Sequence, residues 1–485
     1  MVLSWSKELL VNATFWSALG GLAVALWLWW RRGAGIAPEH RAARVTGLFL
    51  SSWFLVCLIL VNVLNAGIVI YMSYVAPLDA TQDIASAEGL LRGERIYDPH
   101  LSDAVHASLQ NDPARFSLAA YWPALKAKEA LAQQEPYHTQ AHPPLMTVAF
   151  APLVALLGIR GTCLAMAPLS LAALGLVLIL LRQVLAPGLP ARPAVVIVAA
   201  VLGWEPVLSL LRQGQSGLLL SALMVLGWWS LRRNHAGSAG VAIGAATCLK
   251  LYPGLLLVYL FLRNRRAFRA ALLTILALSG LSLLVLRWQD YLDYAQSAHT
   301  VVTRFARSPH NLSLLGFLAR DMGLKGANLG AAIALLSVLG VLLVGVTGWL
   351  VRRRAGEYVD DGETLDLEYS LFLILMPLLS PVAWDHYLTI LLLPVAVLGR
   401  RVLTYGTSWA AVSGFFALLA ALATPVLTLI WVFAVPGRQR TMMSLADSLI
   451  TWAVAAFWAW SVKLYRELRR ADTIVAGDPV LAPES

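Results

Sequence analysis

The chain has 485 residues, of which 59% are hydrophobic and only 13% are charged, and its mean hydropathy is +0.70. Soluble domains contain about 45–50% apolar and about 25% charged residues, so this inventory cannot cover a globular surface that faces water. The formal net charge of +10 does not indicate nucleic-acid binding, because the arginine clusters follow apolar segments, as cytoplasmic loops do. The composition therefore predicts an all-α, polytopic integral membrane protein embedded in a lipid bilayer.

The first apolar run, about residues 12–30, is followed by Arg31 and Arg32. A cleavable signal peptide carries its basic residues in front of the apolar run, so we expect a retained helix. Residues 1–45 are thus predicted to form an extra N-terminal transmembrane helix and a cytoplasmic turn. The next run, 46–72, then leads outward into the extracytoplasmic loop 73–142.

Further apolar runs continue to the end of the chain, and some are long enough to span about 30 Å of hydrocarbon while others are not. Short helices are tolerated in a membrane where their ends line a cavity inside the protein. We therefore expect about 12–14 transmembrane helices, with short broken helices lining an outward-facing cavity. The segment around Arg160 is compatible with a full crossing or with a shallow hairpin. The long runs are 163–182, 194–212, 269–287, 327–350, 408–434 and 445–462, and the short ones are 145–158, 216–231, 238–249, 253–262, 369–380 and 386–399.

Basic clusters near the end of the chain, at 352–354 and 463–470, indicate the cytoplasmic side by the positive-inside rule. They place residues 288–325 and 381–386 outside. The catalytic or transport domain is predicted to cover 46–470, and residues 471–485 to form a disordered cytoplasmic tail. This organisation is typical of a multi-pass protein of a bacterial inner membrane, with its working surface facing the periplasm.

Two carboxylates, Asp79 and Asp83, follow the second apolar run directly. If this stretch is helical, they lie one turn apart on one face. A pair of carboxylates at a membrane exit suits general-base chemistry, because neighbouring groups can raise one pKa. The alternative is that they cap an interfacial helix, since Asp favours helix starts.

His142 stands before Pro143 and Pro144, where the outer loop returns to the membrane. The prolines pre-set an extended entry into the next helix and hold His142 at the interface. The alternative is a polar residue that only begins a helix.

Lys250 interrupts an apolar run and is followed by Tyr252 and Pro253, while Arg212 and Gln215 lie at an earlier break. An ionisable group inside a membrane segment marks a functional site by default, and a cation at a helix break can hold a phosphate. The alternative is that the Lys250 ammonium snorkels to the interface.

The segment 380–387 carries Trp384, His386 and Tyr387 between two short helices. His386 is suited to phosphate binding or proton transfer, and the two aromatic rings to sugar stacking or to the interfacial aromatic belt. A companion loop, 307–313, contains His310 and Asn311. The sequence contains no P-loop, dinucleotide fingerprint or metalloprotease helix, and the cysteines, all in apolar runs, predict neither disulfides nor a zinc site.

Together these motifs resemble glycosyltransferase family 87, within the GT-C superfamily of integral-membrane enzymes. Family members carry an Asp outside an early helix, then Leu-Leu-x-Gly and Tyr-Asp, followed by His-Pro-Pro, Gly-Gln and Lys-x-x-Pro elements. This sequence departs from the family in two places, since Gly217 stands where an Asn usually follows Gly-Gln-x and the extra N-terminal helix is not expected of every member. The matching elements here are Asp79, 90–93, 97–98, 142–144, 214–215, 250–253, 311–314 and 380–386.

The resemblance implies inverting transfer of a sugar, with mannose first, from a polyprenyl-phosphate donor to a glycolipid or glycan acceptor. Asp79 would be the general base, and Asp83 would position the acceptor or tune Asp79. The donor phosphate would be bound by Lys250, His386, His142, Tyr252 and Arg212. The substrate-binding set would be Gln215, Asn311, His310, Trp384 and Tyr387.

No cofactor and no metal site are expected, because no second carboxylate cluster offers hard oxygen ligands, although the sequence leaves a divalent metal open. The main alternative from another class is a polytopic transporter or lipid-linked-glycan flippase, which would also carry ionisable residues in broken helices. A glycan polymerase or ligase is a second alternative. The long outer loop with its Asp pair favours the glycosyltransferase.

Overall fold

The computed structural model describes residues 79–97, 140–308, 310–324, 326–352, 362–404, 409–422 and 439–477, with isolated positions between 56 and 67. The predicted span 12–30, most of 46–72 and most of the outer loop lie outside these residues. Asp98 and the end of the tail, 478–485, also lie outside them.

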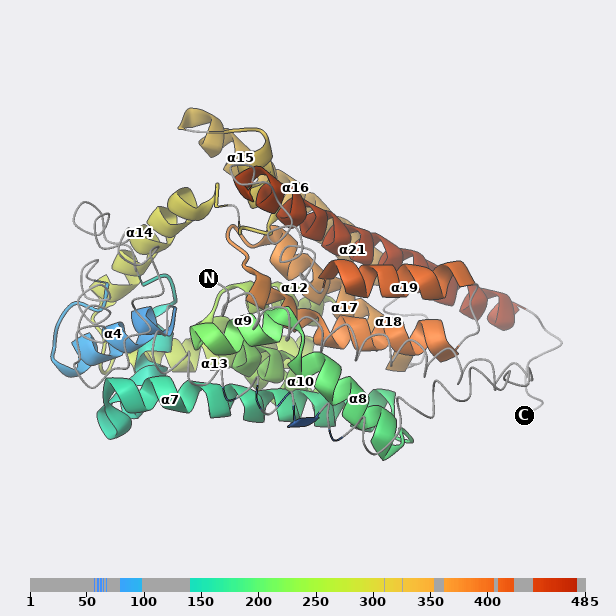
Figure 1. Cartoon of the computed structure of the whole chain (residues 1–485), viewed down its shortest axis with the longest axis horizontal. Helices are drawn as coiled ribbons and strands as arrows, with labels where there is room; N and C mark the ends of the chain where they lie inside the picture. The colour runs from blue at the N-terminus through green and yellow to red at the C-terminus, as the bar shows by residue number, and fades with distance from the viewer. Residues whose placement is uncertain are drawn as a thin grey trace.

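Every regular element of the described part is a helix, and Figure 1 shows these helices packed into a bundle with a few long helices. The all-α membrane fold is therefore confirmed. The tail was predicted to begin at 471, whereas α21 continues to Gly477. The helices are α4 Ala80–Leu91, α7 Pro144–Leu185, α8 Ala191–Leu202, α9 Glu205–Gln213, α10 Gly217–Arg232, α11 Ala236–Leu249, η2 Tyr252–Gly254, α12 Leu255–Arg263, α13 Arg265–Ser282, α14 Trp288–Phe305, α15 Leu314–Asp321, α16 Ala327–Arg352, α17 Gly362–Leu379, η3 Asp385–Leu391, α18 Leu392–Thr404, α19 Trp409–Leu422 and α21 Gln439–Gly477.

Two of the described helices, α7 and α16, are long and apolar enough to cross a membrane. A third span results if α8 and α9, which are bent by 55° relative to one another, cross as one unit. Several other apolar helices are shorter than a bilayer requires. The total of 12–14 crossings stays a prediction, because it includes segments outside the described residues.

The helix α7 is kinked just before Arg160, at Gly158. Gly158 has φ 67° and ψ 177°, a backbone region open to glycine and strained for other residues. The short first part of α7 packs its Met146 and Phe150 against Ile84 of α4. This apolar contact holds α4, and with it Asp79, against the start of α7.

The core is centred on α17, which is buried along nearly its whole length. A helix that is apolar on all sides belongs in the interior of a bundle, and α17 contacts α12, α16, α18 and α21. The apolar α16 is instead largely exposed, as befits a helix that faces lipid. The acidic residues of α17 all lie in its N-terminal half.

Two helices that lead toward the cavity, α10 and α11, are too short to cross a bilayer alone. At 1.5 Å per residue, α10 is about 24 Å long and α11 about 21 Å, whereas the hydrocarbon core is about 30 Å thick. At one end of these helices lie the segments around Gln215, Lys250 and Ser380. At the other end lie Arg232, Arg263 and Arg401. Because α10 and α11 are shorter than the hydrocarbon core is thick, space remains for a cavity at the end near Gln215, Lys250 and Ser380.

At the basic end, three acidic residues of α17 pair with arginines from four other helices. Basic residues that are buried need such partners. The pairs are Glu363–Arg401 at 3.3 Å, Asp366–Arg232 at 3.4 Å, Glu368–Arg263 at 2.8 Å and Glu368–Arg469 at 3.8 Å, and the Tyr465 hydroxyl donates to Glu368 at 2.8 Å. The basic clusters thus gather at one end of the bundle and stabilise it there.

The two buried ion pairs of Glu368 predict that Glu368→Gln strongly destabilises the protein. Glu368 is fully buried, so the substitution removes the negative charge that Arg263 and Arg469 share, at a cost of about 3–5 kcal/mol. We expect a clearly lowered Tm in detergent. The control is Glu467→Gln, because the Glu467–Lys463 pair is exposed and contributes about 0–1 kcal/mol. Equal Tm values for the two variants would contradict this role.

Candidate active site

A cavity of about 910 Å³ opens at the end of the bundle opposite the basic cluster. Its walls come from the start of α4, the segment before α7, the end of α9, the break between α11 and α12, α14, and the segment 380–387. All predicted site residues except Asp83 and Asn311 line it. The predicted residues that line the cavity are Asp79, His142, Arg212, Gln215, Lys250, Tyr252, His310, Trp384, His386 and Tyr387.

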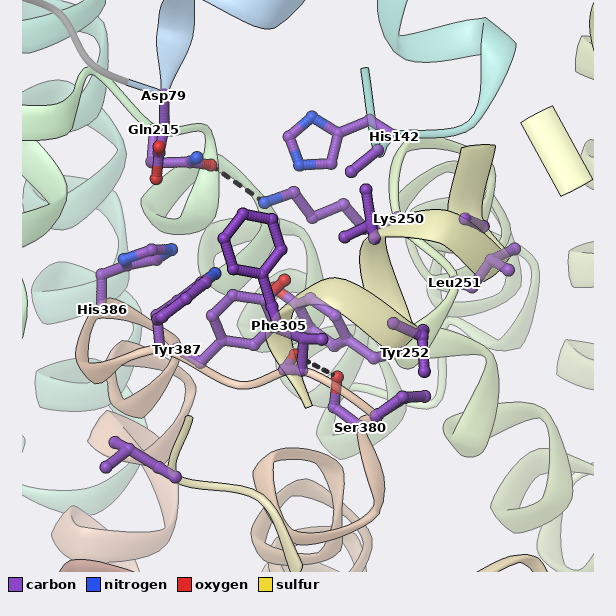
Figure 2. A pocket seen from close by; sticks show the side chains of 18 of the residues that line it. Asp79, His142, Gln215, Lys250, Leu251, Tyr252, Phe305, Ser380, His386 and Tyr387 are labelled. Atoms are coloured by element: carbon purple, nitrogen blue, oxygen red, sulfur yellow. Dashed lines mark hydrogen bonds between the residues drawn. The ribbon is translucent and has the colours of Figure 1, made fainter. Parts of the chain in front are cut away.

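Lys250 is the buried cation of this cavity. It follows the end of α11 in an extended conformation (φ −144°, ψ 146°), because Pro253 in η2 interrupts the helical run. Its side chain is 4% exposed, and its Nζ donates to Gln215 Oε1 at 3.0 Å (Figure 2). Among the described residues no carboxylate lies within salt-bridge distance of it. The snorkelling alternative therefore does not describe this ammonium.

Gln215 is brought to Lys250 by the turn that ends α9. Gly214 has φ 65°, a left-handed conformation that glycine adopts without strain. The next helix then starts at Gly217, where a Cβ would lie 2.6 Å from Leu210 Cδ1. A side chain at this position would have to displace the flexible end of Leu210. Gln215 is the polar side chain that faces Lys250.

Asp79 lies at the N-terminus of α4 and lines the cavity beside Gln215 (Figure 2). Its side chain makes no capping hydrogen bond, so the capping alternative does not account for it. Among the described residues its carboxylate has no hydrogen bond or ion pair, and it interacts electrostatically with Lys250. The helix dipole favours a negative charge at this position. Asp79 is thus a half-buried carboxylate that is open to a ligand.

Asp83, one turn later, lies in a different environment. Its side chain is 1% exposed and does not line the cavity. Its Oδ1 accepts hydrogen bonds from His142 Nδ1 at 2.7 Å and from Gln140 Nε2 at 3.1 Å. Asp83 therefore acts on the cavity indirectly, through its hydrogen bond to His142. Gln140 was not predicted, although it lies two residues before His142 in the same motif.

His386 is a buried imidazole without a hydrogen-bond partner. It is 2% exposed, and within the described part of the chain neither ring nitrogen makes a hydrogen bond. Its Nδ1 is 3.5 Å from Asp385 Oδ1. Asp385, which sequence reasoning passed over, also interacts electrostatically with Arg212. Arg212 itself pairs with Glu205, so its charge is largely compensated.

Aromatic rings form one side of the cavity. The Tyr387 ring lies 5.4 Å from Lys250 Nζ and 5.2 Å from the Tyr252 ring. Trp384 packs edge-on against Phe305 of α14 at 5.5 Å. Such rings offer flat apolar surface for a sugar, and the Tyr387 ring also lies over the Lys250 ammonium.

Asn311 connects two segments about 70 residues apart in sequence. It is fully buried. Its Oδ1 accepts from the Ala383 amide at 3.0 Å, and its Nδ2 donates to the Pro381 carbonyl at 3.1 Å. The amide is therefore occupied by the backbone, so Asn311 holds segment 380–387 in place instead of facing the cavity. His310, its neighbour, lies exposed at the cavity wall.

No three His, Cys, Asp or Glu residues come together as metal ligands within the described ranges. Metal-independent chemistry stays a prediction.

The Asn311 contact predicts that Gly316→Ala disturbs the site. A Cβ at Gly316 would lie 2.2 Å from the Asn311 carbonyl oxygen, so the loop that positions 380–387 must shift. We expect a lower Tm by detergent thermal unfolding, with a cost of about 1–3 kcal/mol. Gly330→Ala is the control, because that helical glycine faces open space and alanine is the better helix former. An unchanged Tm in Gly316→Ala would show that this contact is dispensable.

Comparison with known proteins agrees with the motifs. The chain is 31% identical to a polyprenol-phosphate-mannose-dependent alpha-(1-2)-phosphatidylinositol mannoside mannosyltransferase of Mycobacterium tuberculosis strain H37Rv, over 53% of this chain and 61% of the relative. It is 28% identical to the protein of the same description from Mycolicibacterium smegmatis, over 66% of this chain and 76% of the relative. The chain thus spans about three fifths to three quarters of these relatives. No solved structure matches.

The family model for glycosyltransferase family 87 matches residues 141–381. This segment includes His142, Gln215 and Lys250, begins after Asp79 and ends before His386. The matched residues, just under half of the chain, form the larger part of the cavity wall, so this wall is similar to that family.

Proposed function

We propose that this protein transfers a sugar, with mannose as the first candidate, from a polyprenyl-phosphate donor to a hydroxyl of a glycolipid or glycan. The observation that carries the proposal is the Lys250 ammonium, which is buried, faces the cavity and has a neutral amide as its hydrogen-bond partner. Burying a cation without a partner costs several kcal/mol. A phosphate monoanion or diester in the cavity would compensate this charge.

The same cavity provides a base and further phosphate ligands. Asp79 takes the proton of the attacking hydroxyl while the acceptor oxygen forms a bond to the anomeric carbon and the bond to the phosphate oxygen breaks. A single displacement of this kind inverts the anomeric centre. Lys250 and His386 balance the charge on the departing polyprenyl phosphate. Tyr252 and Arg212 complete the phosphate side of the cavity.

An apolar groove of about 720 Å³ supports a lipid-linked donor. It lies between α12, α16 and α17 and shares Val302, Leu379 and Pro381 with the polar cavity. Glycines of α16, including Gly340 and Gly345, contribute to its floor. A phosphate bound near Lys250 can therefore continue into an isoprenoid chain that lies in this groove.

The charge distribution supports an extracytoplasmic active site. The arginines at the ends of α10, α12 and α18 lie at the end of the bundle opposite the cavity. Under the positive-inside rule this basic end faces the cytoplasm. The protein would then be a multi-pass protein of a bacterial cytoplasmic membrane, with the cavity open to the periplasm and the C-terminus inside.

The proposal predicts that Asp79→Asn abolishes transfer without unfolding the protein. General-base catalysis contributes about 10²–10⁴-fold, and asparagine preserves size while removing basicity. Purified enzyme would be assayed with polyprenyl-phosphate-mannose and phosphatidylinositol mannosides, the substrates in the relatives' descriptions.

Asp293→Asn is the matched control, because Asp293 lies on α14 but does not line the cavity. Full activity in a folded Asp79→Asn would contradict the assignment of the base. If wild type forms no glycosidic bond but moves lipid-linked sugar across vesicles, the transporter alternative is correct.

A further inference from the structure

The buried pair formed by Asp83 and His142 has a defined hydrogen-bond polarity. An ionised carboxylate can only accept hydrogen bonds. Because Asp83 Oδ1 is 2.7 Å from His142 Nδ1, the ring proton of the neutral imidazole must be on Nδ1. The second ring nitrogen, Nε2, then carries a lone pair and can only accept.

The surrounding backbone fixes the direction of the imidazole ring. The Tyr97 hydroxyl donates to the His142 carbonyl at 2.7 Å, and the His142 amide donates to Gln140 Oε1 at 3.2 Å. Pro143 then begins the rigid entry into α7. The Asp83 contact holds the ring itself, and His142 lines the cavity, where Figure 2 shows it beside Lys250.

The neutral form of His142 is favoured by its surroundings. Burial lowers the pKa of His142 below its ordinary value, and the positive charge of Lys250 lowers it further. The carboxylates of Asp83 and Asp79 act in the opposite direction without reversing the shift. A neutral imidazole with its proton on Nδ1 cannot donate to a phosphate. Within the described part of the chain, no hydrogen bond reaches Nε2, so this acceptor is open to the cavity.

We propose that the Asp83–His142 pair binds a hydroxyl of the acceptor sugar, one other than the hydroxyl that Asp79 deprotonates. This inference rests on the proposed function and changes the role of His142 from phosphate ligand to acceptor-hydroxyl ligand. Asp83 becomes a positioning residue, which keeps the proton on Nδ1. A sugar hydroxyl is the ligand class that matches a neutral acceptor atom in a polar cavity.

The test is a full kinetic matrix in which donor and acceptor concentrations are both varied, for wild type, His142→Phe and Asp83→Leu. We expect the acceptor KM to rise about tenfold, the worth of one hydrogen bond to an otherwise unpaired group, while the donor KM stays within about twofold of wild type. A raised donor KM with an unchanged acceptor KM would overturn the proposal in favour of phosphate binding. Equal rises in both, or a loss of kcat alone, would indicate a merely structural role and also overturn it.

Two further measurements keep the test independent of folding. His142→Gln places an amide oxygen near the position of Nε2 and should restore part of the acceptor affinity. In wild type, one singly deoxygenated acceptor should show the same rise in acceptor KM, of about tenfold, that His142→Phe shows with the full acceptor. That analogue and the full acceptor should have equal KM values in His142→Phe. If no deoxygenated acceptor behaves in this way, the hydroxyl site does not exist.

The control variant is His299→Phe, an exposed histidine of α14 that does not line the cavity. It should leave both KM values unchanged. Failure of the inference is distinguishable from failure of the proposed function. Wild type that forms no glycosidic bond from any polyprenyl donor contradicts both, whereas active wild type with a donor-specific effect of His142→Phe contradicts the hydroxyl site alone.

Discussion

The Lys250 ammonium imposes the main constraint on this molecule. A buried cation requires compensation, and the nearest polar partner is the neutral side-chain oxygen of Gln215. Two breaks in the helical framework create this contact, the Gly214 turn after α9 and the Pro253 turn before α12. The Tyr387 ring lies over the ammonium, and this ring also contacts the imidazole of His386. The site is therefore arranged for an anion to arrive from outside the protein.

The position of the cavity follows from helix length and from the charges at the opposite end. The helices that carry Gln215 and Lys250 are shorter than the bilayer is thick, so they cannot close both ends of the bundle. Buried ion pairs around Glu368 tie the arginine-bearing ends together. Stability is thus concentrated at the basic end, and the open end is free to bind substrates. Asn311 then connects the last wall of the cavity to the rest.

Much of the site could be predicted from the sequence because its residues interrupt apolar runs. Lys250 and His386 are polar residues among apolar runs. The number of predicted membrane crossings places both on the same side of the membrane as Asp79. All three line one cavity. The segment around Arg160 could not be resolved in this way, because hydropathy does not report the backbone kink at Gly158.

The individual roles were less accessible from sequence. Asp79 and Asp83 are equivalent by spacing, and only the contact with His142 and Gln140 distinguishes the open carboxylate from the buried one. Asn311 is an unremarkable polar residue until its partners, about 70 residues later, are known. Arg469, from the basic cluster 463–470 that indicated topology, also binds Glu368 of α17. Such long-range pairings are not encoded in local patterns.

The most direct measurement is the Kd for polyprenyl phosphate, without a sugar, determined for wild type, Lys250→Met and Lys250→Arg in detergent. A buried, charge-assisted contact is worth about 1.5–3 kcal/mol, so Lys250→Met should bind about 10–100-fold more weakly, while Lys250→Arg retains most of the affinity. Lys463→Met, at an exposed lysine far from the cavity, should bind as wild type does. Equal affinity in Lys250→Met and wild type would contradict the assignment of this cavity to the donor phosphate.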